Sequence, residues 1–338
     1  MTDQSRIPLP PRDFAGSAAD DGTGSLIERA VKAFDLSGLA PPPVPQGLAP
    51  SRPRPPAPRR VEPVATAEVA SESVVASAPE PAVRAAPVAP VAFPSPVHKI
   101  DRDHLLRQGL IVPEGAVTEV LEEFRIVKRQ LLAQAAELAR QGGGAAAQRV
   151  LISSPHPSEG KTYCAVNLAL SIAAEKESEV VLVDADFAKP SILSALGLPG
   201  GPGLMDALSD PAIDLADCVV GTDIPGLWVL PAGNATTTDS EYLNSSRTAA
   251  VLARLTDGAP RRMVIFDSPP ALSASPAAEL ARHVGQTLVI VRADQTGQGA
   301  LEDAISLLSG CPNIQLLLNA VSFSPSGRRF GSYYGYGE

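Results

Sequence analysis

The residues best suited to chemistry lie in the loop 153–162, which reads Ser-Ser-Pro-His-Pro-Ser-Glu-Gly-Lys-Thr. The loop follows a short aliphatic run and precedes an apolar run with helical spacing. This order of strand, loop and helix brings backbone N–H groups and a helix N-terminus together around phosphate oxygens. We therefore predict that Lys161 reaches the β- and γ-phosphates of ATP and that Thr162 ligates Mg²⁺. The predicted nucleotide-binding residues of this loop are Ser158, Glu159, Gly160, Lys161, Thr162 and Tyr163.

The loop departs from the strict phosphate-loop pattern at one place. The first glycine of that pattern would stand at position 155, where the chain has Pro155. A Gly-Lys-Thr at a helix start can also occur by chance. His156 is flanked by two prolines, and we expect it to be a surface residue rather than a catalytic one.

Three carboxylates end two of the predicted strands. Asp184 ends the run Val180–Asp184 and Asp186 follows two residues later, while Asp267 ends the run Met263–Asp267. The carboxyl ends of neighbouring parallel strands open into one crevice, so these acids should meet the phosphate loop there. We expect Asp186 and Asp267 on the metal side, through water, because carboxylates beside a triphosphate need a cation between them.

Asp184 is expected to orient or deprotonate an attacking hydroxyl. The predicted catalytic residues are Lys161, Asp184 and Asp186. The alternative for each acid is a structural role, in which a strand-end carboxylate caps the loop that follows it.

Tyrosine is rare and unevenly placed in the chain. Three of its five tyrosines, Tyr333, Tyr334 and Tyr336, lie in the last six residues among glycines. Such a terminus can enter the crevice of a neighbouring copy, so we predict these three as phosphate acceptors. Each phosphate adds roughly −1.5 to −2 charges, which would repel the tail from an acidic domain. The alternative is a tail that only packs or frays.

Short aliphatic runs alternate with helical runs from Arg149 onward, which predicts a doubly wound, mostly parallel α/β sheet. The helices expected are Val117–Ala139, Thr162–Ala174, Ser191–Leu196, Glu241–Thr256, Pro276–His283 and Gly299–Leu308. The strands expected are Val150–Ser153, Val180–Asp184, Leu227–Leu230, Met263–Asp267, Leu288–Val291 and Gln315–Leu318.

Prolines divide the chain into segments. Sixteen of the 34 prolines fall between Pro41 and Pro96, in a stretch with a single aromatic residue, Phe93. That stretch cannot bury enough surface to offset its ordering entropy. We predict a disordered start (1–24), a short amphipathic helix (25–36), a disordered Pro/Ala-rich linker (37–99), a leading segment with a helix (100–148), the phosphate-binding domain (149–323) and a Gly/Tyr-rich tail (324–338).

Charge and cysteine content exclude some classes of protein. The net charge is −9, and residues 101–338 supply all of it with 18 basic against 27 acidic residues, which argues against a nucleic-acid-coating role. Three scattered cysteines fit a reducing compartment without a zinc cluster. No apolar run reaches membrane-spanning length, and the first residues lack the apolar core of a signal peptide. We expect a cytoplasmic protein, recruited to the inner face of the plasma membrane by a partner.

Taken together, these motifs resemble those of the bacterial tyrosine kinases over about 117–338. The loop 153–162, the Asp184-Ala-Asp186 strand end and the Asp267-Ser-Pro-Pro strand end look like the Walker A, A′ and B motifs of that family, whose fold is a MinD/ParA-like P-loop NTPase. The early Ser-Leu-Ile-Glu-Arg-Ala run and the Leu-Ile-Val-Pro segment are most similar to the exosortase- or exopolysaccharide-associated branch. The resemblance implies an ATP- and Mg²⁺-dependent kinase that phosphorylates its own C-terminal tyrosines in trans and regulates exopolysaccharide or capsule biosynthesis and export.

The same resemblance implies further residues and partners. Glu122, Arg125 and Lys128 occupy the family's Glu-x-x-Arg-x-x-Arg oligomerisation motif, with Lys128 keeping charge but losing bidentate geometry. Asn319 would face the adenine. Ala188 stands where the family commonly has arginine, and the neighbouring Lys189 is the alternative source of that charge. The implied partners are other copies in a ring, a membrane-embedded chain-length-determinant or polysaccharide co-polymerase that activates the kinase, and a phosphotyrosine phosphatase.

Two other functions remain open. A positioning or partitioning ATPase would use water as the acceptor, but those proteins carry an additional lysine early in the loop, where this chain has His156. A non-catalytic regulator would use nucleotide binding only to switch a partner of the polysaccharide machinery.

Overall fold

The computed structural model describes residues 89–94, 96–236 and 238–321. Three predicted segments lie outside these residues, namely the start of the chain (1–24), the amphipathic helix (25–36) and the tail (324–338) with its three tyrosines. Most of the predicted linker lies outside them as well. Within the described part, no helix combines the length and the apolarity needed to cross a bilayer.

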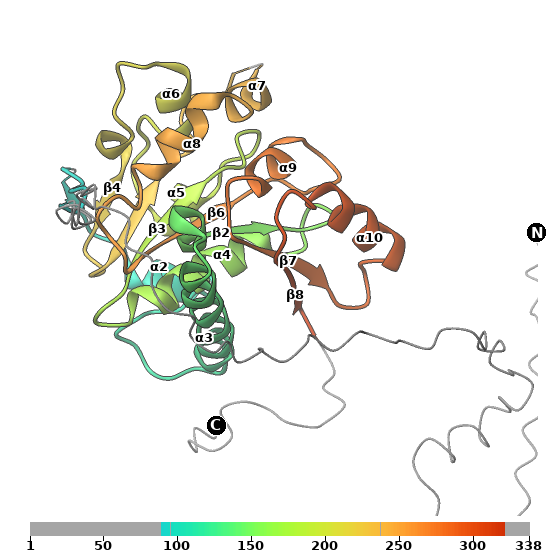
Figure 1. The fold of residues 1–338 in the computed structure, drawn as a ribbon. Coiled ribbons are helices and arrows are strands. Elements are labelled where there is room, and N and C mark those ends of the chain that lie inside the picture. The colour runs from blue at the N-terminus through green and yellow to red at the C-terminus, as the bar shows by residue number, and fades with distance from the viewer. Residues whose placement is uncertain (1–88, 95, 237, 322–338) are drawn as a thin grey trace, which may run out of the picture. The chain divides into compact units, whose positions relative to one another are not determined.

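The described residues build one eight-stranded sheet in the order β1-β4-β5-β3-β6-β2-β7-β8 (Figure 1). Neighbouring strands run parallel except β4 and β5, which pair antiparallel. The predicted mostly parallel α/β architecture is therefore confirmed. The strands are β1 (Val97–His98), β2 (Arg149–Ser153), β3 (Glu179–Asp184), β4 (Val220–Thr222), β5 (Leu227–Leu230), β6 (Arg262–Asp267), β7 (Gln286–Arg292) and β8 (Ile314–Asn319).

Helices cover both faces of the sheet. Alternate residues of each central strand therefore point into two different cores, one on each face. Val181 of β3 belongs to the core under α6, α8, α9 and α10, while its neighbour Leu182 belongs to the core under α2, α3, α4 and α5. The helices are α2 (Arg102–Arg107), α3 (Glu119–Arg140), α4 (Lys161–Ala173), α5 (Ile192–Leu196), α6 (Leu204–Ser209), α7 (Asp239–Leu243), α8 (Ser246–Ala253), α9 (Pro276–Ala281) and α10 (Gln298–Leu307), with 3-10 turns at Gly144–Gln148 and Leu215–Cys218.

The six predicted strands are all present. Helices α2 and α6 have no counterpart among the predicted helices, and two predicted helices differ from the observed ones. The helix expected over Glu241–Thr256 is divided into α7 and α8, because Ser245 takes an extended backbone and starts a new helix. The long helix begins at Glu119 rather than Val117, because the Thr118 hydroxyl caps it by accepting the Leu121 N–H at 3.2 Å.

The end of the predicted linker is packed rather than disordered. Phe93 is 7% exposed, and its ring centroid lies 5.1 Å from that of Trp228. The Arg262 guanidinium stacks over the same ring at 4.4 Å, and the Val91 N–H donates to the Asp257 carbonyl at 3.1 Å. The linker boundary at residue 99 is therefore corrected: the described residues from 89 onward pack on the domain, because the one aromatic residue of the stretch finds an apolar partner and a cation.

Replacing Phe93 with alanine should lower the free energy of unfolding by about 3 kcal/mol, because it removes a buried ring, its edge-to-face contact with Trp228 and its contact with the Arg262 guanidinium. Urea denaturation of the full chain measures the change. Val97→Ala is the control, since Val97 is 67% exposed on the neighbouring strand β1 and should change the value by less than about 0.5 kcal/mol. Equal effects of the two substitutions would show that Phe93 does not anchor this segment.

Candidate active site

The phosphate loop connects the end of β2 at Ser153 with the start of α4 at Lys161. Gly160 has φ +98°, a left-handed conformation that glycine adopts without strain. A Cβ atom at this position would lie 2.2 Å from the Asn319 side-chain nitrogen. The backbone conformation therefore favours glycine at 160, and a larger residue would also displace the Asn319 amide from this place.

A buried carboxylate braces this loop from within. Glu159 is 4% exposed, and its Oε2 accepts the N–H of His156 at 2.8 Å. Its Oε1 accepts the hydroxyl of Thr296, which follows β7. His156 itself is exposed, as expected. Glu159 thus fixes the conformation of the phosphate loop through these two hydrogen bonds. Thr296 is a site residue that the sequence pattern does not indicate.

Two more side chains hold the loop from outside. Arg292 at the end of β7 donates from Nη1 to the Ser158 carbonyl at 2.9 Å. Asn319 at the end of β8 donates from Nδ2 to the Glu159 carbonyl at 2.9 Å. Asn319 therefore lies against the phosphate loop, and its predicted contact with adenine stays a prediction.

Replacing Thr296 with valine should weaken nucleotide binding about tenfold, because the buried Glu159 carboxylate loses a hydrogen bond and the loop loses its brace. Titration of the full chain with a fluorescent ATP analogue measures the affinity. Thr296→Ser is the matched control, since it keeps the hydroxyl, and it should bind within about twofold of the parent. Undiminished affinity in the valine variant would mean that the brace does not shape the binding loop.

Asp267 and the phosphate-loop helix meet directly. The Thr162 hydroxyl, in the first turn of α4, donates to Asp267 Oδ2 at 2.6 Å. The other oxygen, Oδ1, is buried and has no hydrogen-bond partner among the described residues. Burial raises the Asp267 pKa to about 7, with repulsion from Asp184 adding to the rise. A hydroxyl beside a carboxylate with an unsatisfied oxygen fits Mg²⁺ and its bound water, and the predicted metal role of Thr162 and Asp267 stays a prediction.

Asp184 lies beside Asp267, since the two residues are in register on adjacent strands β3 and β6. Asp184 Oδ2 accepts the N–H groups of Ser191 and Ile192, at 2.8 and 3.0 Å. Burial raises the Asp184 pKa to about 6. The capping contacts that were the alternative for this residue are thus present, while its predicted role toward an attacking hydroxyl stays a prediction.

Lys161 and Asp186 complete the set of predicted catalytic residues. Lys161 is the first residue of α4, is 8% exposed and is close enough to Asp267 to lower its pKa. Asp186 is half-buried and raises the same pKa. In the part of the chain that the structure describes, no three carboxylate, imidazole or thiol groups gather into a metal cluster. Water and phosphate oxygens would complete the coordination of a Mg²⁺ ion held at this site.

The Tyr163 side chain points away from the phosphate loop. Its hydroxyl donates to the Gly109 carbonyl at 3.0 Å, and its ring packs edge-on against Phe124 at 6.4 Å. Only the main chain of Tyr163 is therefore placed to contact a nucleotide. The predicted role of Tyr163 in nucleotide binding is limited to its backbone.

The predicted oligomerisation charges of α3 separate into two groups. Lys128 is 6% exposed, and its amine bonds the Ser171 carbonyl at 3.0 Å and Glu175 at 2.9 Å. Lys128 is thus engaged within its own chain, which corrects the expectation that it faces a neighbouring subunit. Glu122 and Arg125 pair with each other and are partly exposed.

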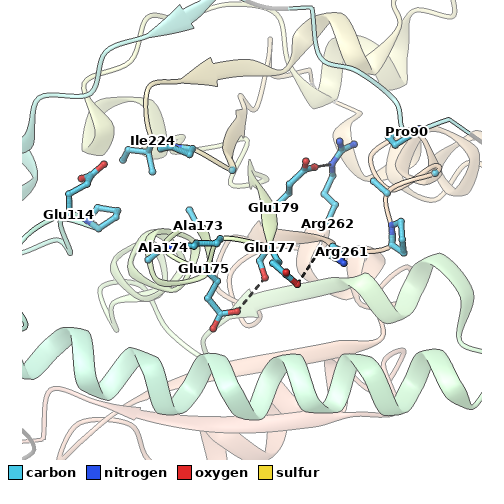
Figure 2. Close-up of a pocket in the computed structure, with 18 residues that line it drawn as sticks. Pro90, Glu114, Ala173, Ala174, Glu175, Glu177, Glu179, Ile224, Arg261 and Arg262 are labelled. Carbon is cyan, nitrogen blue, oxygen red and sulfur yellow. Dashed lines mark hydrogen bonds and ion pairs between the residues drawn. The ribbon is translucent and has the colours of Figure 1, made fainter.

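A pocket of about 680 Å³ lies at the opposite end of the sheet. Figure 2 shows the Glu179–Arg262 ion pair in its lining, with an N–O distance of 2.9 Å. Glu179 starts β3 and Arg262 starts β6, so this pocket opens at the amino ends of the strands. The candidate active site lies at their carboxyl ends, and the pocket in Figure 2 is separate from it.

Sequence similarity to known proteins shows the family of this chain. The tyrosine-protein kinase YwqD of Bacillus subtilis is 30% identical over 188 residues, which are 56% of this chain and 76% of that protein. This chain belongs to the bacterial tyrosine kinases. No protein-family model matches it.

Other members of the bacterial tyrosine kinases match a shorter share of their own length. The tyrosine-protein kinase wzc of Salmonella typhimurium is 28% identical over 189 residues, which are 55% of this chain and 26% of that kinase. This chain therefore spans about a quarter of such relatives. The crystal structure of the chimerical protein CapA2B2 matches with a TM-score of 0.52 and 22% identity over 67% of this chain and 95% of that one. At this identity the match supports the fold alone.

Proposed function

We propose that the protein is an ATP-dependent protein-tyrosine autokinase that phosphorylates Tyr333, Tyr334 and Tyr336 of another copy. The observation that carries the proposal is the direct contact between Thr162 of the phosphate loop and Asp267 of the neighbouring strand end. Membership of the bacterial tyrosine kinases supports tyrosine as the acceptor.

The roles of the residues follow from their positions. Lys161 and the loop N–H groups would hold the β- and γ-phosphates, while Thr162, with Asp186 and Asp267 through water, would hold Mg²⁺. The cation would neutralise charge on the phosphates. The tyrosine oxygen forms a bond to the γ-phosphorus, the bond to the bridging oxygen breaks, and ADP leaves with that electron pair. Asp184 orients the tyrosine and accepts its proton, for which its raised pKa is favourable.

Incubation of the purified full chain with ATP and Mg²⁺ tests this function. We expect phosphotyrosine to form, and we expect EDTA to abolish it because EDTA removes the Mg²⁺ that would neutralise charge on the phosphates. ATP hydrolysis without phosphotyrosine, stimulated by a DNA-bound or membrane-bound partner, would instead identify a regulatory ATPase of the positioning type.

The wider role is proposed from the family resemblance of the motifs. The kinase would act in exopolysaccharide or capsule production, where a membrane-embedded co-polymerase would activate it. A phosphotyrosine phosphatase would remove the phosphates that it adds. Glu122 and Arg125 would join copies into a ring. Arg125→Glu should then lower the oligomer mass, and unchanged light scattering across concentrations would contradict that role.

A further inference from the structure

A second pocket, of about 350 Å³, opens beside the candidate active site. Its lining comes from the loops that follow β3, β5 and β6, three neighbouring strands of the sheet. Ala188 lies two residues after Asp186, and Pro269 lies two residues after Asp267. The pocket is therefore next to the residues that would handle the γ-phosphate, on the side away from β7 and β8.

The lining combines apolar and acidic groups. Ala188, Ala274 and Pro276 offer apolar surface. Asp239 and Glu241 at the start of α7 offer two carboxylates. Glu241 is exposed, and one oxygen of Asp239 accepts the Thr236 N–H at 2.7 Å. Among the residues that the structure describes, no lysine or arginine lines this pocket, although exposed Lys189 follows Ala188. Such a pocket suits an aromatic ring with a basic neighbour, and it repels an added phosphate.

The C-terminal residues have this chemistry. Arg328 and Arg329 precede Tyr333 by five and four residues. An extended chain rises about 3.3 Å per residue, so these cations lie roughly 13–16 Å from the ring and can reach the pocket rim while the tyrosine enters. The intervening residues are neutral.

We propose that this pocket is the acceptor subsite, and that it receives the segment 327–337 of a second copy with Arg328 and Arg329 against Asp239 and Glu241. The inference rests on the proposed kinase function and adds a rule of recognition to it: basic residues four to five positions before the tyrosine favour binding. Phosphorylation reverses the attraction, because the product brings negative charge beside two carboxylates. The product then leaves and the next tyrosine enters.

A charge-swap experiment between full-length copies tests the proposal. The donor copy carries phenylalanine at 333, 334 and 336, and the acceptor copy carries Lys161→Met, so that transfer runs one way. Adding Glu241→Arg to the donor should slow acceptor phosphorylation about fivefold at low salt, and less at high salt. Arg328→Glu with Arg329→Glu in the acceptor should slow transfer from the unaltered donor and restore most of the rate with the Glu241→Arg donor.

Glu302→Arg in the donor is the matched control, since Glu302 is exposed on α10 outside both pockets, and it should leave the rate unchanged. Equal transfer by the unaltered and Glu241→Arg donors, or failure of the swapped pair to recover, would overturn the acceptor subsite while leaving the kinase intact. Absence of transfer with the unaltered donor would overturn the proposed function and this inference with it.

Discussion

Replacing Lys161 with methionine is expected to slow tyrosine phosphorylation about 100- to 1,000-fold. The lysine is the first residue of α4 and lies beside the buried Asp267. A fixed cation at this point stabilises charge that develops during phosphoryl transfer, and donors of this kind contribute on that scale. Initial rates of phosphotyrosine formation with Mg-ATP measure the effect.

Lys176→Met is the control, because Lys176 is an exposed lysine beyond the other end of α4. It should leave the rate within about twofold, and circular dichroism should show both variants folded. Phosphorylation that persists in the folded Lys161→Met variant would show that phosphoryl transfer does not take place at the phosphate loop.

Replacing Tyr333, Tyr334 and Tyr336 together with phenylalanine should remove nearly all phosphotyrosine while nucleotide affinity stays the same. Only two other tyrosines exist in the chain, Tyr163 and Tyr242. Both are partly buried, and the hydroxyl of Tyr163 is already bonded to Gly109. Phosphate incorporation per chain, measured with labelled ATP, gives the result.

The control is the pair Tyr163→Phe and Tyr242→Phe, which should keep most of the label. Retained label in the triple variant would place the acceptor outside the tail, and loss of nucleotide affinity would show that the tail supports the site itself.

Strands β3 and β6, which end in Asp184 and Asp267, were predictable because their sequence pattern is strong. Continuous aliphatic runs that end in Asp184 and Asp267 can be buried on both faces, and parallel strands bring their carboxyl ends together. The register that places these two acids side by side follows from that topology. The phosphate loop was predictable for the same reason, since strand and helix flank it directly.

Other features depend on contacts between distant residues, which leave little trace in local sequence. Strands β1 and β4 have two and three residues, too few for a pattern. Thr296 reaches Glu159 across 137 positions. Lys128 looks like a surface charge on a helix, but the end of α4 supplies it with a carbonyl and a carboxylate. Phe93 lies in a composition typical of disorder, and its contacts with the distant residues Trp228 and Arg262 place it against the domain.

The proposed function requires that this chain transfers phosphate from ATP to its own C-terminal tyrosines. Tandem mass spectrometry of the purified full chain, after incubation with ATP and Mg²⁺, tests it most directly. We predict phosphate on Tyr333, Tyr334 and Tyr336, and none on the same residues when EDTA is present or Lys161 is methionine. ATP consumption that leaves these three tyrosines unmodified would contradict the account.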